Sequence, residues 1–314
     1  SMGALLLAGT LSAQTPVPEW QAGVDKVKTL IQSNPAQASE EAGELLKGKN
    51  KKNVDLVTSV AHVYLDAGKI TEAQEYLAMA KKANNKDPKV SVLEGDIALA
   101  QKNIGQACQL YEQAIYFDPN CKEAYLKYAQ AYKSASPTQA IEKLEQLKAV
   151  DPNCLEADRE LAEVYYSGNR FGKAAEMYAK FIDTPLATED DMLKYAFALF
   201  LNHDFEKSLQ VAQKGLQKNA RHAAFNRLVM YNNTDLKRYE DAEKAADAFF
   251  NASDRADYSY LDYRYYGALL SALKKYDKAI IEYGKALDKD NTQVDLWREI
   301  SDAHEMNNNY AEAI

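Results

Sequence analysis

Three cysteines are the side chains in this chain that could most readily bind a metal, form a disulfide or act as a nucleophile. They are Cys108, Cys121 and Cys154, and the last two each end the word Asp-Pro-Asn-Cys. The chain has no C-x-x-C pair, which is the usual spacing for a zinc site or a redox dithiol. The repeated Asp-Pro-Asn-Cys sequence is therefore part of a metal site, a disulfide or a reactive thiol motif, or it is a structural element of a repeating fold.

The histidines do not form a metal-binding or catalytic pattern either. His62, His203, His222 and His304 contain no His-x-x-x-His or Glu-x-x-His pair. The sequence also lacks a G-x-S-x-G turn, a glycine-rich phosphate loop and a Walker-type Gly-Lys-Ser/Thr. We therefore predict no catalytic residue, no metal and no cofactor.

Composition points to a helical protein with an acidic surface. Of 314 residues, 46% are hydrophobic, while 13 Gly and 8 Pro are few for this length. Ala, Leu, Lys, Glu and Gln dominate, and these residues favour helix. The net charge of −8 argues against a general nucleic-acid binder, which needs clustered cations to neutralise phosphates.

Residues 1–18 resemble the end of a secretory leader. The run "ALLLAG" is followed by "TLSAQT", with a small residue at Ala13 as an exit site, although the basic leading segment is missing and the first lysine is Lys26. We predict an exported protein, periplasmic or outer-membrane-associated in a Gram-negative bacterium. No apolar run approaches the ~20 residues that span a bilayer, so we predict no integral membrane segment.

An alanine recurs along the chain at a nearly constant interval, with a bulky residue three positions before it. The interval is about 34 residues throughout, which is the signature of a repeat architecture. We call these positions the period residues, and Ser208 takes the place of alanine at one of them: Ala73, Ala107, Ala140, Ala174, Ser208, Ala242, Ala279 and Ala313.

Each repeat contains two amphipathic segments. The first carries a small residue followed three positions later by a bulky one, as at Ala61 and Tyr64, which places both on one helical face. A short polar turn follows, and a second helix is expected to open at the period residue. Asp-Pro then ends the pair at 118–119 and 151–152, and the following Asn is expected to cap the next helix.

This pattern of paired amphipathic segments resembles the tetratricopeptide repeat over residues 53–314. Trp297, Ile300 and Ser301 in "DLWREISDAH" match the Trp-x-x-Leu-Gly opening of that family. The resemblance implies an all-α fold, a right-handed superhelical solenoid of antiparallel helix pairs whose first helices line a concave groove. Residues 19–52 resemble a degenerate first pair, which gives eight pairs and an incomplete last repeat, and we expect the native chain to continue past Ile314.

The repeat also explains the cysteines, because Cys121 and Cys154 are separated by one repeat interval. Equivalent positions in neighbouring repeats lie about 10 Å apart, the distance between packed helices. A disulfide requires Cα atoms within ~7 Å. We therefore predict that Cys121 and Cys154 are unlinked and that all three cysteines pack at helix seams or ends.

A candidate binding groove lies in the middle of the array. Leu193, Phe197 and Phe200 are apolar at first-helix positions that the family geometry places in solvent, so they could seat a peptide or a helix of a partner. The alternative is that they pack against a neighbouring helix. The predicted partner-binding set is Arg159, Tyr166, Leu193, Phe197, Phe200, Phe225 and Arg264.

We interpret the chain as a non-catalytic protein-protein interaction scaffold. The Lys/Asn/Arg set with which some family members grip a carboxylate is absent, because Glu163, Leu193 and Phe197 occupy the equivalent places. Tyr260 and Tyr265 are expected to be exposed and able to stack on a ligand or a sugar ring. The alternatives are an accessory glycan-binding or outer-membrane-assembly component, or the adaptor part of a longer enzyme; the oligomeric state is left open.

Overall fold

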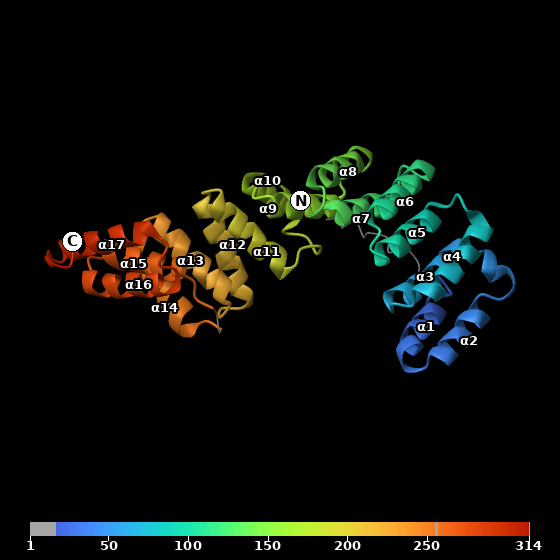
Figure 1. The fold of residues 1–314 in the computed structure, drawn as a ribbon, viewed down its shortest axis with the longest axis horizontal. Helices are drawn as coiled ribbons and strands as arrows, with labels where there is room; N and C mark the ends of the chain where they lie inside the picture. The colour runs from blue at the N-terminus through green and yellow to red at the C-terminus, as the bar shows by residue number, and fades with distance from the viewer. Residues whose placement is uncertain (1–16, 255–256, 314) are drawn as a thin grey trace, which may run out of the picture. The chain divides into compact units, whose positions relative to one another are not determined.

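The computed structural model describes residues 17–254 and 257–313, and these residues form helices and turns with no strand. They divide into two compact units, residues 1–143 and 144–314, with the boundary inside one helix. Each unit consists of consecutive helices packed as antiparallel pairs (Figure 1). The fold is an all-α repeat solenoid, as predicted.

The first unit contains the pairs that precede this boundary. Its elements are α1 (Gln21–Ser33), α2 (Pro35–Leu45), the 3-10 helix η1 (Gly48–Lys52), α3 (Val54–Asp66), α4 (Ile70–Asn84), α5 (Pro88–Ala100), α6 (Ile104–Phe117), α7 (Lys122–Tyr132) and the start of α8 (Pro137–Val150). The degenerate pair predicted within residues 19–52 is α1 and α2.

The second unit continues the same arrangement. It contains the rest of α8, then α9 (Leu155–Ser167), α10 (Phe171–Phe181), α11 (Glu189–Leu201), α12 (Phe205–Lys218), α13 (Ala223–Asp235), α14 (Tyr239–Asp247), the π-helical turn η2 (Ala248–Ala252), α15 (Tyr260–Ala272), α16 (Tyr276–Lys289) and α17 (Val294–Met306). The described residues thus contain the predicted eight pairs, followed by α17.

The period residues lie buried where the two helices of each pair are in contact. The side chains of Ala73, Ala107 and Ala140 are fully buried, as are those of the equivalent residues through Ala279. On the partner helix, a Cβ added to Gly95 would lie 2.5 Å from the Tyr111 ring, so only glycine permits this approach. The prediction was wrong in one detail, because each second helix begins three residues before its period residue.

Ser208 keeps its place in the core because its hydroxyl is fully satisfied. Its Oγ donates to the carbonyl of Ala196 at 2.8 Å and accepts from Asn232 Nδ2, also at 2.8 Å. Asn232 is itself fully buried inside α13 and also donates to the carbonyl of Leu228. Residues 232–233 belong to the regular helix α13.

The two Asp-Pro-Asn-Cys words are helix joints, as predicted, but with a different capping residue. Asp118 follows the end of α6, and its Oδ1 accepts from the backbone N–H of Asn120 at 2.9 Å. The N-cap of α7 is Cys121, so Asn120 lies in the turn and does not cap the helix. The second Asp-Pro-Asn-Cys segment repeats this geometry, and Cys108, Cys121 and Cys154 form no disulfide with any described residue.

The predicted leader, residues 1–18, falls almost wholly outside the described residues. Among the residues that the structure describes, none of the helices is both long and apolar enough to cross a membrane.

Candidate functional site

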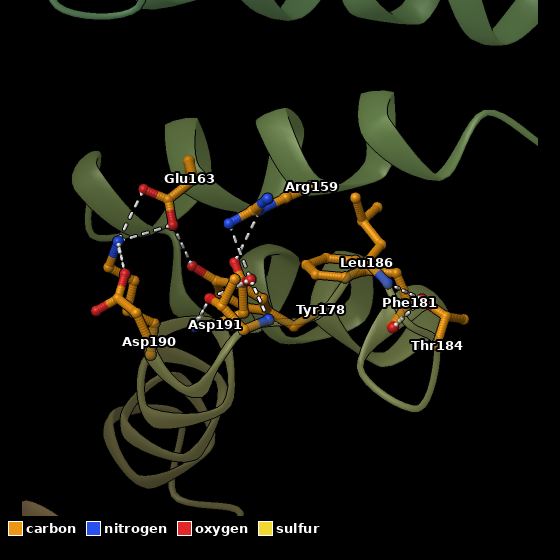
Figure 2. Close-up of polar contacts among 10 residues, drawn as sticks. Arg159, Glu163, Tyr178, Phe181, Thr184, Leu186, Asp190 and Asp191 are labelled. Carbon is orange, nitrogen blue, oxygen red and sulfur yellow. Dashed lines mark hydrogen bonds and ion pairs between the residues drawn. The ribbon is translucent and has the colours of Figure 1, made fainter. Parts of the chain in front are cut away.

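The first helices of the second unit, α9, α11, α13, α15 and α17, form a surface that we call the first-helix face. Neighbouring helices on this face are joined by ion pairs. In the first of them, Arg159 of α9 donates from Nε to Asp191 Oδ1 of α11 at 3.1 Å, and its Nη2 lies 3.0 Å from Oδ2 (Figure 2). Asp191 is buried and also accepts from the backbone and hydroxyl of Thr188, in a capping box that starts α11.

A second network lies one helical turn away on the same pair of helices. Glu163 accepts from Lys194 Nζ at 2.9 Å and from the Tyr178 hydroxyl at 2.9 Å, and Lys194 also pairs with Asp190 (Figure 2). Burial, reinforced by Glu163, raises the pKa of Tyr178, so it stays a neutral donor. Burial alone would lower the pKa of Lys194, but its carboxylate partners raise it. Lys194 is thus a charged, fully engaged group.

The same construction recurs two repeats later. Arg227 of α13 donates from Nε to Asp262 Oδ1 of α15 at 2.7 Å, and the Tyr231 hydroxyl donates to the same oxygen at 2.8 Å. Asp262, like Asp191, closes a capping box, here with Ser259. The predicted site set includes neither aspartate, although the pattern Ser/Thr-x-x-Asp before a helix is a readable signal.

The predicted cations are on this face but are not free. Arg159 is held by Asp191, and Arg264 of α15 makes a bidentate ion pair with Glu299 of α17 at 2.6 to 3.2 Å. Such pairs hold side chains in a fixed geometry. The two arginines therefore position neighbouring repeats, and each is already engaged by a carboxylate.

The predicted aromatic and apolar residues separate into two groups. Tyr166, Leu193 and Phe197 are half-buried, so part of each is accessible. Phe200 is only 9% exposed and packs against other rings, and Phe225 is 0% exposed. Placing Phe225 in the groove was wrong, because its ring fills the space left by Gly215, where a Cβ would lie 2.5 Å from it.

Phe200 belongs to an aromatic cluster that runs from α11 to α15. Its ring centroid lies 5.6 Å from that of Tyr231 and 6.2 Å from that of Tyr265. Tyr231 and Tyr265 stack with centroids 4.0 Å apart and an interplanar angle of 17°. Tyr265 is thus half-buried, and one face of its ring, which the sequence left free to stack on a ligand, is occupied by Tyr231.

The cluster borders a recess on the first-helix face that sequence reasoning missed. The recess has a volume of about 330 Å³ and is lined by Thr234, Asp235, Leu261, Arg264, Tyr265, Ala268 and Glu299. The carboxylate of Asp235 accepts from the Tyr265 hydroxyl at 2.9 Å and has no ion-pair partner among the described residues. Burial raises the pKa of Asp235 against the opposing effects of that hydrogen bond and of the nearby His203.

This arrangement is suited to non-covalent binding of a ligand, because it presents fixed carboxylates, aromatic edges and a small recess on rigid helices. Within residues 17–254 and 257–313, no group of three or more His, Cys, Asp or Glu is placed to hold a metal ion.

Comparisons with known proteins support the repeat assignment. Residues 61–120 and 129–186 match the family model of the tetratricopeptide repeat. The structure resembles that of PilF from Pseudomonas aeruginosa, with a TM-score of 0.51, 15% identity and coverage of 66% of this chain and 96% of the other. It also resembles PilW, described as a widely conserved type IV pilus biogenesis factor, with a TM-score of 0.50, 17% identity and coverage of 63% and 92%.

No curated protein sequence matches the chain. At these identities the two structural likenesses concern the fold alone. Two segments of the chain, residues 61–120 and 129–186, are thus similar to the tetratricopeptide repeat, and the helix pairs on both sides of them continue the same pattern.

Proposed function

We propose that this protein is a non-catalytic scaffold that binds a segment of a partner protein along the first-helix face of the second unit. In this proposal a lysine or arginine of the segment enters the recess between α13, α15 and α17. The observation that carries the proposal is Asp235, a carboxylate in the recess that accepts from one tyrosine hydroxyl and forms no ion pair with the described residues.

A basic side chain suits this recess for three reasons. An added cation would form the ion pair that Asp235 lacks, in surroundings where burial disfavours the lone charge. Tyr265 supplies an aromatic wall, against which a cation is also favourable. The volume of about 330 Å³ is at the lower end of the range for ligand sites, so it suits one long side chain better than a whole small molecule.

The rest of the segment would lie toward α11. Leu193 and Phe197 are half-buried on that helix and offer apolar contact. Arg159 and Arg264 would act as positioning residues, because their ion pairs hold α9 to α11 and α15 to α17. A surface that is already ordered loses little conformational entropy on binding, which favours affinity.

Site-specific photo-crosslinking tests the proposal. Benzoylphenylalanine is placed at Leu261 in the recess, or as a control at Ile281, which is 59% exposed on α16. Each protein is irradiated with an envelope extract of the native organism. We expect a discrete crosslinked protein from position 261 that is absent from position 281, and we expect Asp235→Lys in the 261 background to abolish it.

Two results would contradict the proposal. One is a crosslinking pattern that is the same from both positions. The other is a specific product at position 261 that survives Asp235→Lys. The fold of each variant is checked by circular dichroism; Asp235 lies at the end of α13 and is exposed overall, so its replacement should leave the helices intact.

We also propose that the protein acts in the cell envelope. The support is the apolar "ALLLAG" run followed by small and polar residues within residues 1–18. Immunodetection in separated periplasmic, membrane and cytoplasmic fractions of the native organism tests this, and recovery in the cytoplasmic fraction would contradict it.

A further inference from the structure

We propose a second docking surface, on the first unit, for an acidic segment of a partner protein. It is a groove between η1 and α4, with a volume of about 380 Å³, and we call it the lysine groove. It lies on the side of the repeat formed by a second helix, so it is separate from the face described above. Its lining residues are Lys51, Lys52, Glu75, Ala78, Met79, Lys82 and Ala83.

The charge of the groove is opposite to that of the protein. Its lining carries three lysines against one glutamate, whereas the chain as a whole has a net charge of −8. Lys51, Lys52 and Lys82 are exposed and form no ion pair with the described residues, unlike neighbouring Lys47, which pairs with Glu44, and Lys81, which pairs with Glu94. These three cations are available to a negatively charged partner.

The backbone that carries Lys51 and Lys52 is fixed by hydrogen bonds. Gly48 has a φ of +60°, which lets the chain turn sharply out of α2. Asn50 then donates from Nδ2 to the carbonyl of Leu45 at 2.9 Å, which satisfies a carbonyl at the end of α2. Asn53 caps α3 by accepting from the N–H of Leu56. Lys51 and Lys52 therefore lie on a turn that is already ordered, so binding of a partner does not require this turn to lose conformational entropy.

The groove also has an apolar part. Met79 and Ala83 are half-buried, Ala78 is exposed, and Met79 packs on the core of the unit below. Methionine adapts its shape to different side chains, as it does at other binding surfaces. An apolar side chain flanked by carboxylates would contact both the lysines and this floor. The concave shape favours such a segment over an anionic membrane, which needs a flat or protruding basic surface.

Peptide selection with counter-selection tests this inference. A displayed library of random dodecapeptides is panned on the wild-type protein and depleted on Lys51→Glu/Lys82→Glu. We expect the enriched peptides to combine acidic residues with an apolar one, and their synthetic versions to bind at least tenfold more weakly to the double variant. Binding should also weaken as the salt concentration rises from about 50 to about 300 mM, because exposed charge pairs are screened. Serine in place of the apolar residue should weaken it further.

The matched control is Lys28→Glu/Lys133→Glu, which makes the same charge change at exposed lysines of the same unit that form no ion pair with the described residues. It should bind the selected peptides like the wild type. The inference is overturned if the selected peptides show no acidic bias, or if the control variant loses as much affinity as the groove variant. It is also overturned if no peptide is enriched while vesicles of equimolar phosphatidylcholine and phosphatidylglycerol bind through Lys51 and Lys82.

Discussion

Replacing Asp262 with asparagine should strongly destabilise the second unit. Asp262 is 0% exposed, and its oxygens accept from Arg227, Tyr231 and the backbone and hydroxyl of Ser259. Asparagine has nearly the same shape but only one acceptor oxygen and no charge. At least one of these donors then loses its partner, and the Arg227 guanidinium is left without a counter-charge.

The expected loss can be worked out from these contacts. Removing one member of a buried ion pair costs about 3 to 5 kcal/mol. The side chain of Arg227 is 23% exposed and can be partly hydrated in the variant, which places the cost at the lower end. The weakened capping box adds up to about 1 kcal/mol. We therefore expect Asp262→Asn to lower the free energy of unfolding by about 3 to 4 kcal/mol.

Urea denaturation followed by circular dichroism measures this change, and native-state hydrogen exchange locates it. Because neighbouring repeats are coupled mainly through their shared interface, amides of α13 and α15 should lose protection first. The control is Asp295→Asn, at a side chain that is 64% exposed and 3.9 Å from Arg298, where the change should be below about 0.5 kcal/mol.

A double-mutant cycle with Arg227→Met completes the test. The combined variant should be at least about 1 kcal/mol more stable than the sum of the two single effects predicts. The reasoning is refuted if Asp262→Asn costs no more than Asp295→Asn, or if the two single effects simply add.

Three further predictions concern stability. Ser208→Ala restores the family residue but should cost about 1 to 2 kcal/mol in urea unfolding, because an N–H of the buried Asn232 loses its acceptor. Gly267→Ala should destabilise the protein, since the new Cβ would lie 2.6 Å from the Tyr283 ring. Gly284→Ala, whose new Cβ would meet no atom within 4 Å, should instead raise Tm, because alanine has a helix propensity up to about 1 kcal/mol better than glycine. Equal effects of the two variants would contradict the close contact between Gly267 and Tyr283. Burial alone would raise the pKa of Asp96, but its contacts with His62, Lys127 and Tyr111 lower that pKa below its usual value. The Asp96 carboxylate therefore contributes its full stabilisation above the unfolded-state pKa of about 3.9, and this contribution is lost as the pH falls through the lower pKa of the folded state. Asp96→Asn should flatten the curve of unfolding free energy against pH below about pH 4.

The regular features of the fold were predictable because they depend on local spacing. A small residue at a fixed period has one physical use, the close approach of two helices, and the buried period residues confirm it. The start of each second helix was misplaced because the bulky residue three positions before the period residue is already helical. The Asn120 cap was misassigned because Asp118, two residues earlier, makes the competing turn contact.

The candidate site was harder to predict because it depends on register and on contacts between repeats. Phe197 and Phe225 were both predicted to be groove residues from the sequence. Phe225 is instead buried in the core, because Gly215 on the neighbouring helix has no side chain and leaves room for its ring. Arg159 looked like a free cation because its partner, Asp191, lies 32 residues away. The recess at Asp235 gave no signal, since it forms only where three first helices meet.

The joints before α11 and α15 show how the same fold tolerates a change of connection. An Asp-Pro pair lies before α7 and α9 and starts α5, where Asp87 is the N-cap and Pro88 the first helical residue. The joints before α11 and α15 have longer segments, 182–188 and 253–259, without an Asp-Pro pair. In each of them a Ser or Thr starts a capping box, and the aspartate of the box also binds an arginine of the preceding first helix. The capping box fixes where the new helix begins, and the arginine fixes its position against its neighbour. Ion pairs across these two joints therefore take the structural role that Asp-Pro has at α5, α7 and α9. The predicted arginines Arg159 and Arg264 are engaged by carboxylates, whereas Asp235 forms no ion pair with the described residues, which is why our proposal rests on Asp235.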